Sequence, residues 1–202
     1  MQADFSVELG GDAPALEIPW RSDDPRVRYY DLKIHPELVQ QIPEAVAHPE
    51  LGSFLSRINA AGFPLATAKC DAWSSSEVAP EEQIFGDRKF ASYIDLFFVD
   101  ERDRCSFEKN ETFAKELCRL LGYAPEIAAT VELVIRHCYY HQGQFVPNNW
   151  EGVNAPVTAF CLTIYVTGFG DSDHDPVRRW MVGLNLLQHA IVQLNSNSQP
   201  KP

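Results

Sequence analysis

Long apolar runs are absent from this sequence, and no stretch approaches the roughly 18 consecutive apolar residues of a membrane-spanning helix. The first residues, Met1 to Asp4, have neither the basic start nor the apolar core of a secretion signal. We therefore expect a soluble, cytoplasmic protein with no membrane partner. The chain has 202 residues and 45% hydrophobic content, which is enough for one good-sized domain or two small ones.

Basic residues are also scarce, with 17 Lys and Arg against 28 Asp and Glu, for a net charge of −11. Affinity for nucleic acid comes largely from Lys and Arg side chains that neutralise phosphates. We therefore predict that nucleic acid is not a partner. An acidic balance usually reflects a solvated surface, and it also suits a protein that binds a basic partner.

Metal, cofactor and disulfide motifs are missing as well. The five cysteines are odd in number and form no Cys-x-x-Cys pair, which favours reduced thiols over a disulfide framework. His137 and His141 have a spacing that chelates an ion on a helix, but their neighbours are typical of a strand. On a strand they would lie about 13 Å apart. No P-loop, nucleophile elbow or dinucleotide fingerprint is present, so we predict no metal and no cofactor.

Apolar periodicity supplies the predicted elements. Spacing of three and four residues predicts helices over residues 36–42, from 49 to near 62, over 110–121 and from 175 onward. Alternation predicts strands, pairing antiparallel, at 64–74, 90–99, 130–142 and 158–168. Two shorter extended pieces, 15–19 and 27–32, precede them.

Strand pairs separated by helices predict the α+β class: a two-layer domain whose mainly antiparallel sheet has about four strands, or slightly more, with helices packed on one face. The predicted organisation is an N-terminal arm (1–34), a single α+β domain (35–196) and a disordered tail (197–202). The element order also suggests an internal αββ duplication, with pseudo-repeats at 48–100 and 110–168 before a C-terminal helix at 175–195.

Alternation along the predicted strands sorts side chains between two faces. Small and apolar residues, including Ala66, Ala68, Cys70 and Ala72, would lie beneath the helices. The opposite face would carry rings and charges. In the strand 130–142 both faces carry polar groups, so either the pair His137 and His141 or the set around Arg136 would join that face. The predicted ligand-binding residues are Lys69, Asp71, Trp73, Tyr93, Asp95, His137, Thr163 and Tyr165.

Aromatic walls with a few ionisable groups are typical of a ligand groove. The leading hypothesis is a non-catalytic domain that binds a small molecule or a protein partner there. One alternative is a hydrolase-type enzyme in which Asp71 and Asp95 act as an acid/base pair with a strand histidine. Another is an acidic inhibitor or assembly protein for a basic partner. A purely structural interpretation also fits, in which Lys69 neutralises the carboxylates and the arm covers the rings. No feature of the sequence indicates an oligomeric state.

Overall fold

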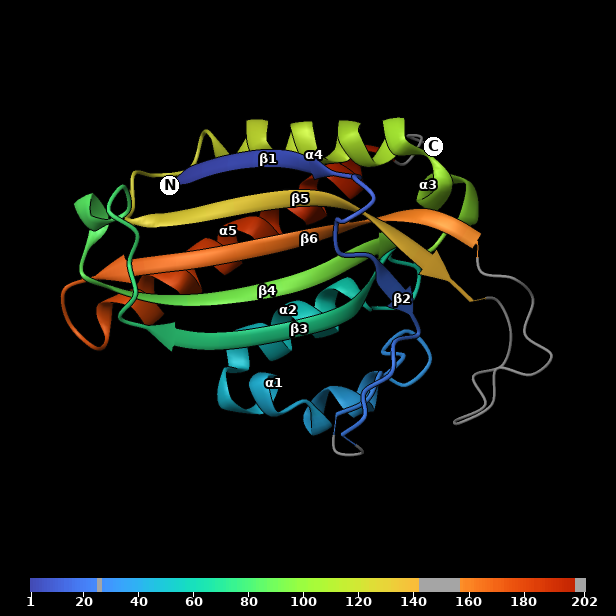
Figure 1. Cartoon of the computed structure of the whole chain (residues 1–202), viewed down its shortest axis with the longest axis horizontal. Helices are drawn as coiled ribbons and strands as arrows, with labels where there is room; N and C mark the ends of the chain where they lie inside the picture. Colours follow the sequence, from blue (N-terminus) through green and yellow to red (C-terminus); the bar gives the residue numbers. More distant parts are fainter. Residues whose placement is uncertain (25–26, 142–156, 199–202) are drawn as a thin grey trace.

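The three longest helices lie on one face of a mixed six-stranded sheet in the structure, a computed structural model that describes residues 1–24, 27–141 and 157–198 (Figure 1). The α+β class is therefore confirmed. The strands are β1 (Gln2–Glu8), β2 (Leu16–Ile18), β3 (Leu65–Ser75), β4 (Arg88–Phe98), β5 (Ala129–Tyr140) and β6 (Val157–Gly170). The helices are η1 (Pro36–Gln41), α1 (Pro43–Ala47), α2 (Pro49–Ile58), η2 (Gln83–Phe85), α3 (Glu101–Cys105), α4 (Phe107–Leu121) and α5 (Asp175–Ser198).

The sheet is larger and more mixed than the predicted sheet of about four mainly antiparallel strands. Its order is β1-β5-β6-β4-β3, with β2 also pairing with β5. The pairs among β3, β4, β5 and β6 are antiparallel, whereas β1 and β2 run parallel to β5. Both parallel strands come from the predicted arm. The order β5-β6-β4-β3 has the arrangement expected for an αββ duplication, but the repeat itself stays a prediction.

A β-bulge changes the facing that alternation predicts for β3. The register with β4 shifts between Thr67 and Cys70, and an extra residue in one strand reverses which face the following side chains occupy. Ala66 and Ala68, predicted to lie beneath the helices, pack on the other face of the sheet. Cys70 and Ala72 do lie against the helix-side core, as alternation predicts.

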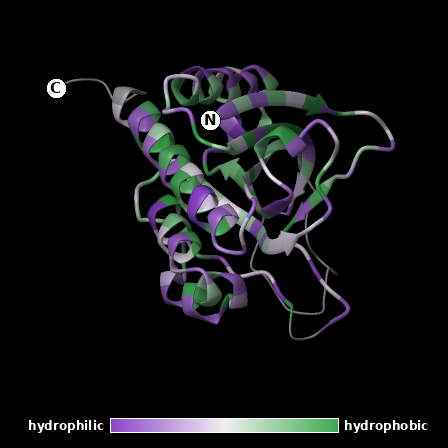
Figure 2. Cartoon of the chain, turned by 90° about the vertical axis from the view of Figure 1, so that its left-hand side faces the viewer, coloured by the Kyte–Doolittle hydropathy of each residue, from purple (hydrophilic) through white to green (hydrophobic). Residues whose placement is uncertain are grey.

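The helix-side core is built from apolar residues of β4, β5 and β6 packed against α2, α4 and α5. Figure 2 shows α5 running along one side of the sheet. Its Trp180 is fully buried, and the indole Nε1 donates to Ser92 Oγ at 2.8 Å. Gly168 of β6 allows α5 to lie this close to the sheet, because a Cβ at that position would overlap the Pro176 carbonyl oxygen. The sheet and α5 therefore meet backbone to backbone.

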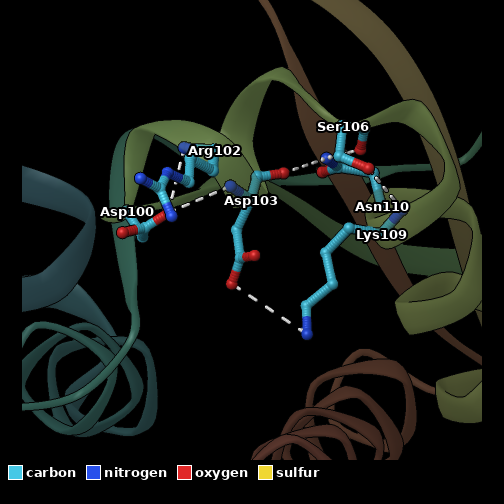
Figure 3. Close-up of polar contacts among 6 residues, drawn as sticks. All are labelled: Asp100, Arg102, Asp103, Ser106, Lys109 and Asn110. Atoms are coloured by element: carbon cyan, nitrogen blue, oxygen red, sulfur yellow. Dashed lines mark hydrogen bonds and ion pairs between the residues drawn. The ribbon is translucent and has the colours of Figure 1, made fainter.

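Two capped helix N-termini, those of α3 and α4, follow β4 within a few residues (Figure 3). The Asp100 carboxylate accepts from the backbone N–H groups of Arg102 and Asp103, which caps α3. The Ser106 hydroxyl accepts from the Lys109 N–H and caps α4. These side chains satisfy N–H groups that helix ends leave without partners. The short α3 was not predicted, because five residues are too few for a periodic pattern.

The N-terminal arm folds over part of the face that lies opposite the helices, which we call the open face. Ile18 of β2 is fully buried there among Ala66, Phe97 and Cys161. Trp20 follows, and its indole donates to the Ala68 carbonyl at 2.7 Å. Further along the arm, the Lys33 ammonium donates to three carbonyl groups at the end of α2, those of Ile58, Ala60 and Phe63. The arm is thus part of the packed structure.

None of the helices in the described residues has the length and apolar character that crossing a membrane requires. Residues 25–26 and 142–156 and the last four residues of the predicted tail, 199–202, lie outside the described residues. The extended piece predicted at 27–32 is not a strand in the part that the structure describes.

Candidate ligand-binding site

Seven of the eight predicted site residues come together on the open face, on the three strands β3, β4 and β6. The register places Asp71 opposite Tyr93 and Tyr93 opposite Tyr165, so these side chains form one row across the strands. Asp95 lies opposite Thr163 in the next row. Lys69 lies in the β-bulge, and Trp73 lies two residues beyond Asp71 on the same strand. The seven residues are Lys69, Asp71, Trp73, Tyr93, Asp95, Thr163 and Tyr165.

His137 is the exception, because it lies on the helix side of β5. Its ring stacks on Phe160 with centroids 5.3 Å apart, and Phe160 contacts Phe107 of α4. The neighbouring Arg136 therefore lies on the open face. This decides between the two sets of β5 residues that the sequence left open. His137 is separated from the carboxylates by the sheet itself.

Asp95 of β4 is a buried carboxylate on this face, with 6% of its surface exposed. One of its oxygens accepts from the Thr163 hydroxyl at 2.5 Å. Burial raises the pKa of Asp95 above its ordinary value, while the Thr163 hydrogen bond and the positive charges of Arg136 and Lys69 act in the opposite direction. Burial dominates, so the negative charge of Asp95 is incompletely compensated.

Arg136 explains why the compensation is incomplete. Its guanidinium is bound to Glu8 of β1, with Nε and Nη2 at 2.9 and 2.8 Å from Oε2. Its Nη1 donates to the Thr163 and Tyr165 hydroxyl oxygens at 3.4 and 3.3 Å. No positive group of the described residues forms an ion pair with Asp95. These contacts form a polar network that runs from Glu8 on β1 to Asp95 on β4. Glu8 forms an ion pair with Arg136, whereas Asp95 has no ion-pair partner among the described residues.

An aromatic row borders the buried carboxylate. The Trp73 and Tyr93 ring centroids are 6.3 Å apart, and the Tyr93 and Tyr165 centroids are 6.1 Å apart. The Arg136 guanidinium lies 5.9 Å from the Tyr165 centroid. Burial raises the pKa of Tyr93, and the charges of Asp95 and Asp71 add to the effect, so its hydroxyl keeps its proton and can donate. Trp73 is 38% exposed, which leaves its ring available for contact.

A pocket of about 350 Å³ adjoins this row between β3 and the arm. Lys69, Asp71 and Tyr93 line it from the sheet, and Trp20 and Tyr30 line it from the arm. The Lys69 ammonium lies 5.5 Å from the Trp20 ring centroid, within the range of a cation–π contact. Pockets of this volume hold small ligands or single side chains.

Two residues of the site were not identified from the sequence, and the facing of a third was left open. Glu8 lies in a segment predicted as an arm, and Trp20 lies after a proline in the same segment. Arg136 was considered, but its facing depends on whether His137 packs against Phe160. A signal for Glu8 exists in the alternation of Ala3, Phe5 and Val7, which is the pattern of a strand.

Comparison with known proteins adds nothing to this site, because no protein-family model, curated protein or solved structure matches the chain.

Proposed function

We propose that the chain is a binding domain whose ligand lies on the uncovered half of the open face and presents a positively charged group to Asp95. The observation that carries this proposal is the incompletely compensated charge of Asp95, buried beside the rings of Tyr93 and Tyr165. A buried charge without a partner is costly, and a bound cation would remove that cost.

The charges around the site favour a cation. Asp71 and Asp95 lie on β3 and β4, and Glu132 of β5 extends the row from Tyr165. Glu8 already neutralises Arg136. Lys69 is exposed, and its ammonium rests over the Trp20 ring. The ligand that best complements this surface combines a protonated amine with a flat apolar part that stacks on the aromatic row.

The hydrolase alternative receives less support from these residues. It requires a histidine within hydrogen-bond reach of the two carboxylates. His137 lies on the other side of the sheet, against Phe160. The His141 N–H donates to the Ile18 carbonyl at the end of β5, away from the row that holds Asp71. A proton-transfer couple of this kind is therefore not assembled among the described residues.

The proposal is tested with tryptamine, which carries an indole ring and a protonated amine, and with its neutral analogue indole-3-propionamide. Titration followed by amide NMR should show shifts in β4 and β6, with tryptamine binding about tenfold more tightly, the gain expected for one charge-assisted hydrogen bond. In Asp95→Asn the two affinities should agree within about twofold.

Asp12→Asn is the matched control, because Asp12 is an exposed acid in the loop after β1 and loses the same charge. It should leave the tryptamine preference intact. Equal binding of the amine and the amide to the unmodified chain, or shifts that map to the helix side, would show that Asp95 does not recognise a cation.

A further inference from the structure

The outer edge of β3 is the feature of this site that the proposed function does not use. β3 lies at the end of the sheet and pairs with β4 on its inner side. In an antiparallel pair the backbone groups of alternate residues point toward the neighbouring strand, and those of the residues between point away from it. An end strand therefore presents a row of hydrogen-bonding groups outward.

The first half of this edge is occupied by side chains of the chain itself. The Thr67 N–H donates to the Asn59 side-chain oxygen at 3.1 Å, which shows that the Thr67 backbone points outward. The Trp20 indole donates to the Ala68 carbonyl at 2.7 Å. Together with the β-bulge that follows, these contacts leave no room in the outward row for another strand at Thr67 and Ala68.

The second half of the edge is different. Thr67 pairs with Leu96 of β4, so the partners of Ile94, Ser92 and Phe90 share its outward orientation. These partners are Cys70, Ala72 and Ser74. The Ala72 N–H is held by the adjacent Asp71 carboxylate at 2.7 Å. No other backbone hydrogen bond joins this outward row to a residue that the structure describes.

The pocket beside the site follows this edge. Five consecutive residues of β3, Thr67 to Asp71, form one of its walls, and the arm with the η1–α1 connection forms the other. The pocket and the free edge therefore lie next to each other along β3, and Asp71 belongs to both. Trp73 continues along the strand on the open face, where its ring contacts Tyr93.

We propose that the partner of this site is an extended polypeptide segment carrying a basic residue, which adds as a further strand along Cys70–Ser74. This inference rests on the proposed function, with the basic residue of the segment as the cation: it meets Asp71 at the edge of the open face, in the row next to that of Asp95. It selects a protein segment over a free small molecule. Strand addition supplies affinity through the backbone, and alternate side chains supply specificity. The side chains on the open-face side of the added strand would lie beside Asp71 and Trp73.

Asp71 makes the edge selective. While its carboxylate holds the Ala72 N–H, an incoming strand has to displace it. A lysine or arginine on that strand would attract the carboxylate and release the N–H for pairing. A glutamate at the same place would be repelled and would leave the N–H blocked. The acidic surroundings of the edge, with Glu44 lining the same pocket, act in the same direction.

The test uses the acetylated and amidated peptide Thr-Val-Thr-Lys-Thr-Val-Thr with three analogues. In two of them glutamate or norleucine replaces the lysine, and in the third the backbone nitrogens on both sides of the lysine are methylated. The lysine peptide should slow hydrogen exchange at Ala72 and Ser74 and bind about fivefold more tightly than the glutamate peptide, as expected for a partly exposed ion pair. The methylated peptide should not protect these amides.

Two variants separate the backbone contribution from the charge. Ala72→Pro removes an outward N–H that β4 does not use, and it should weaken the lysine peptide about tenfold while tryptamine binding is unchanged. Asp71→Asn should reduce the difference between the lysine and glutamate peptides to less than about twofold. Because Asp71→Asn leaves the backbone intact, it also serves if Ala72→Pro folds poorly.

The inference is overturned if the methylated peptide binds as well as its parent, or if no peptide binds while tryptamine does. It is also overturned if sedimentation shows a dimer that Ala72→Pro dissociates, because the edge would then pair with a second copy of the chain. Failure of tryptamine and of all peptides together would instead reject the proposed function.

Discussion

Replacing Asp95 by asparagine should stabilise this protein at neutral pH, although the residue is buried and hydrogen bonded. Asparagine has nearly the same shape, and its side-chain oxygen can still accept from the Thr163 hydroxyl. The change removes a negative charge that Arg136, bound to Glu8, compensates only in part. Burying an ionised group costs several kcal/mol, and the Thr163 hydrogen bond and the charge of Arg136 offset part of that cost, so we expect the change to stabilise by about 1–2 kcal/mol, or to raise Tm by about 2–8 °C.

The pH dependence of this gain follows from the direction of the pKa shift. The pKa of Asp95 is higher in the folded protein than in the unfolded chain, so the folded state binds the proton more tightly. The stability that this supplies is complete below the ordinary aspartate pKa and is lost as the pH rises through the raised value. The free energy of unfolding of Asp95→Asn relative to the unmodified chain should therefore increase from acid to neutral pH.

Urea denaturation of both proteins between pH 4 and 7.5 measures this difference, and contributions from other titrating groups cancel. Asp12→Asn, which changes an exposed aspartate, should show a difference close to zero throughout. A loss of stability in Asp95→Asn that stays constant with pH would refute the reasoning. Asp95 would then be a structural partner of the Arg136 network, and the argument for a cationic ligand would fail with it.

Three further changes test other parts of the structure. Gly168→Ala should cost more than about 2 kcal/mol in urea denaturation, because its Cβ would overlap the α5 backbone, whereas Gly11→Ala should be nearly neutral, since a Cβ there meets nothing within 4 Å. Lys33→Met should cost about 1–2 kcal/mol and speed amide exchange at the end of α2, because three carbonyl contacts are lost. Lys69→Met should strengthen tryptamine binding about threefold in the NMR titration, because the resident cation beside Asp95 is removed.

Alternation in the sequence predicts most of the open face, because in β4 and β6 apolar residues such as Ile94 and Ile164 face the helices, whereas Tyr93 and Tyr165 lie on the other face and are only partly buried. It places Tyr93, Tyr165, Asp95 and Thr163 on one face, and the register of β4 with β6 then aligns them in rows. It fails at the start of β3, where the bulge reverses the facing of Ala66 and Ala68. The sequence pattern does not reveal a bulge in a run of small residues, since an alanine can be accommodated on either face of the sheet. Packing against Ile18, which is distant in sequence, decides the outcome.

The facing of β5 illustrates a different limit. Polar residues occur on both of its sides, so hydropathy alone gives no preference. His137 turns inward because its ring can stack on Phe160, and Arg136 turns outward because Glu8 lies on the adjacent strand. β1 pairs with a strand more than a hundred residues away, and no local pattern could indicate that partner. Long-range pairing therefore determines which charged groups enter the site.

In the proposed function, the arm converts a polar sheet face into a binding site. Ile18 and Trp20 cover part of the open face, and β1 supplies the Glu8 that binds Arg136. Without these contacts, water would reach Asp95 and Arg136 would be free to pair with it. The charge of Asp95 would then cost little stability and would give little preference for a cationic ligand. The cost of burying the Asp95 charge and the proposed affinity for a cation have one structural cause, so changes that loosen the arm should reduce both together.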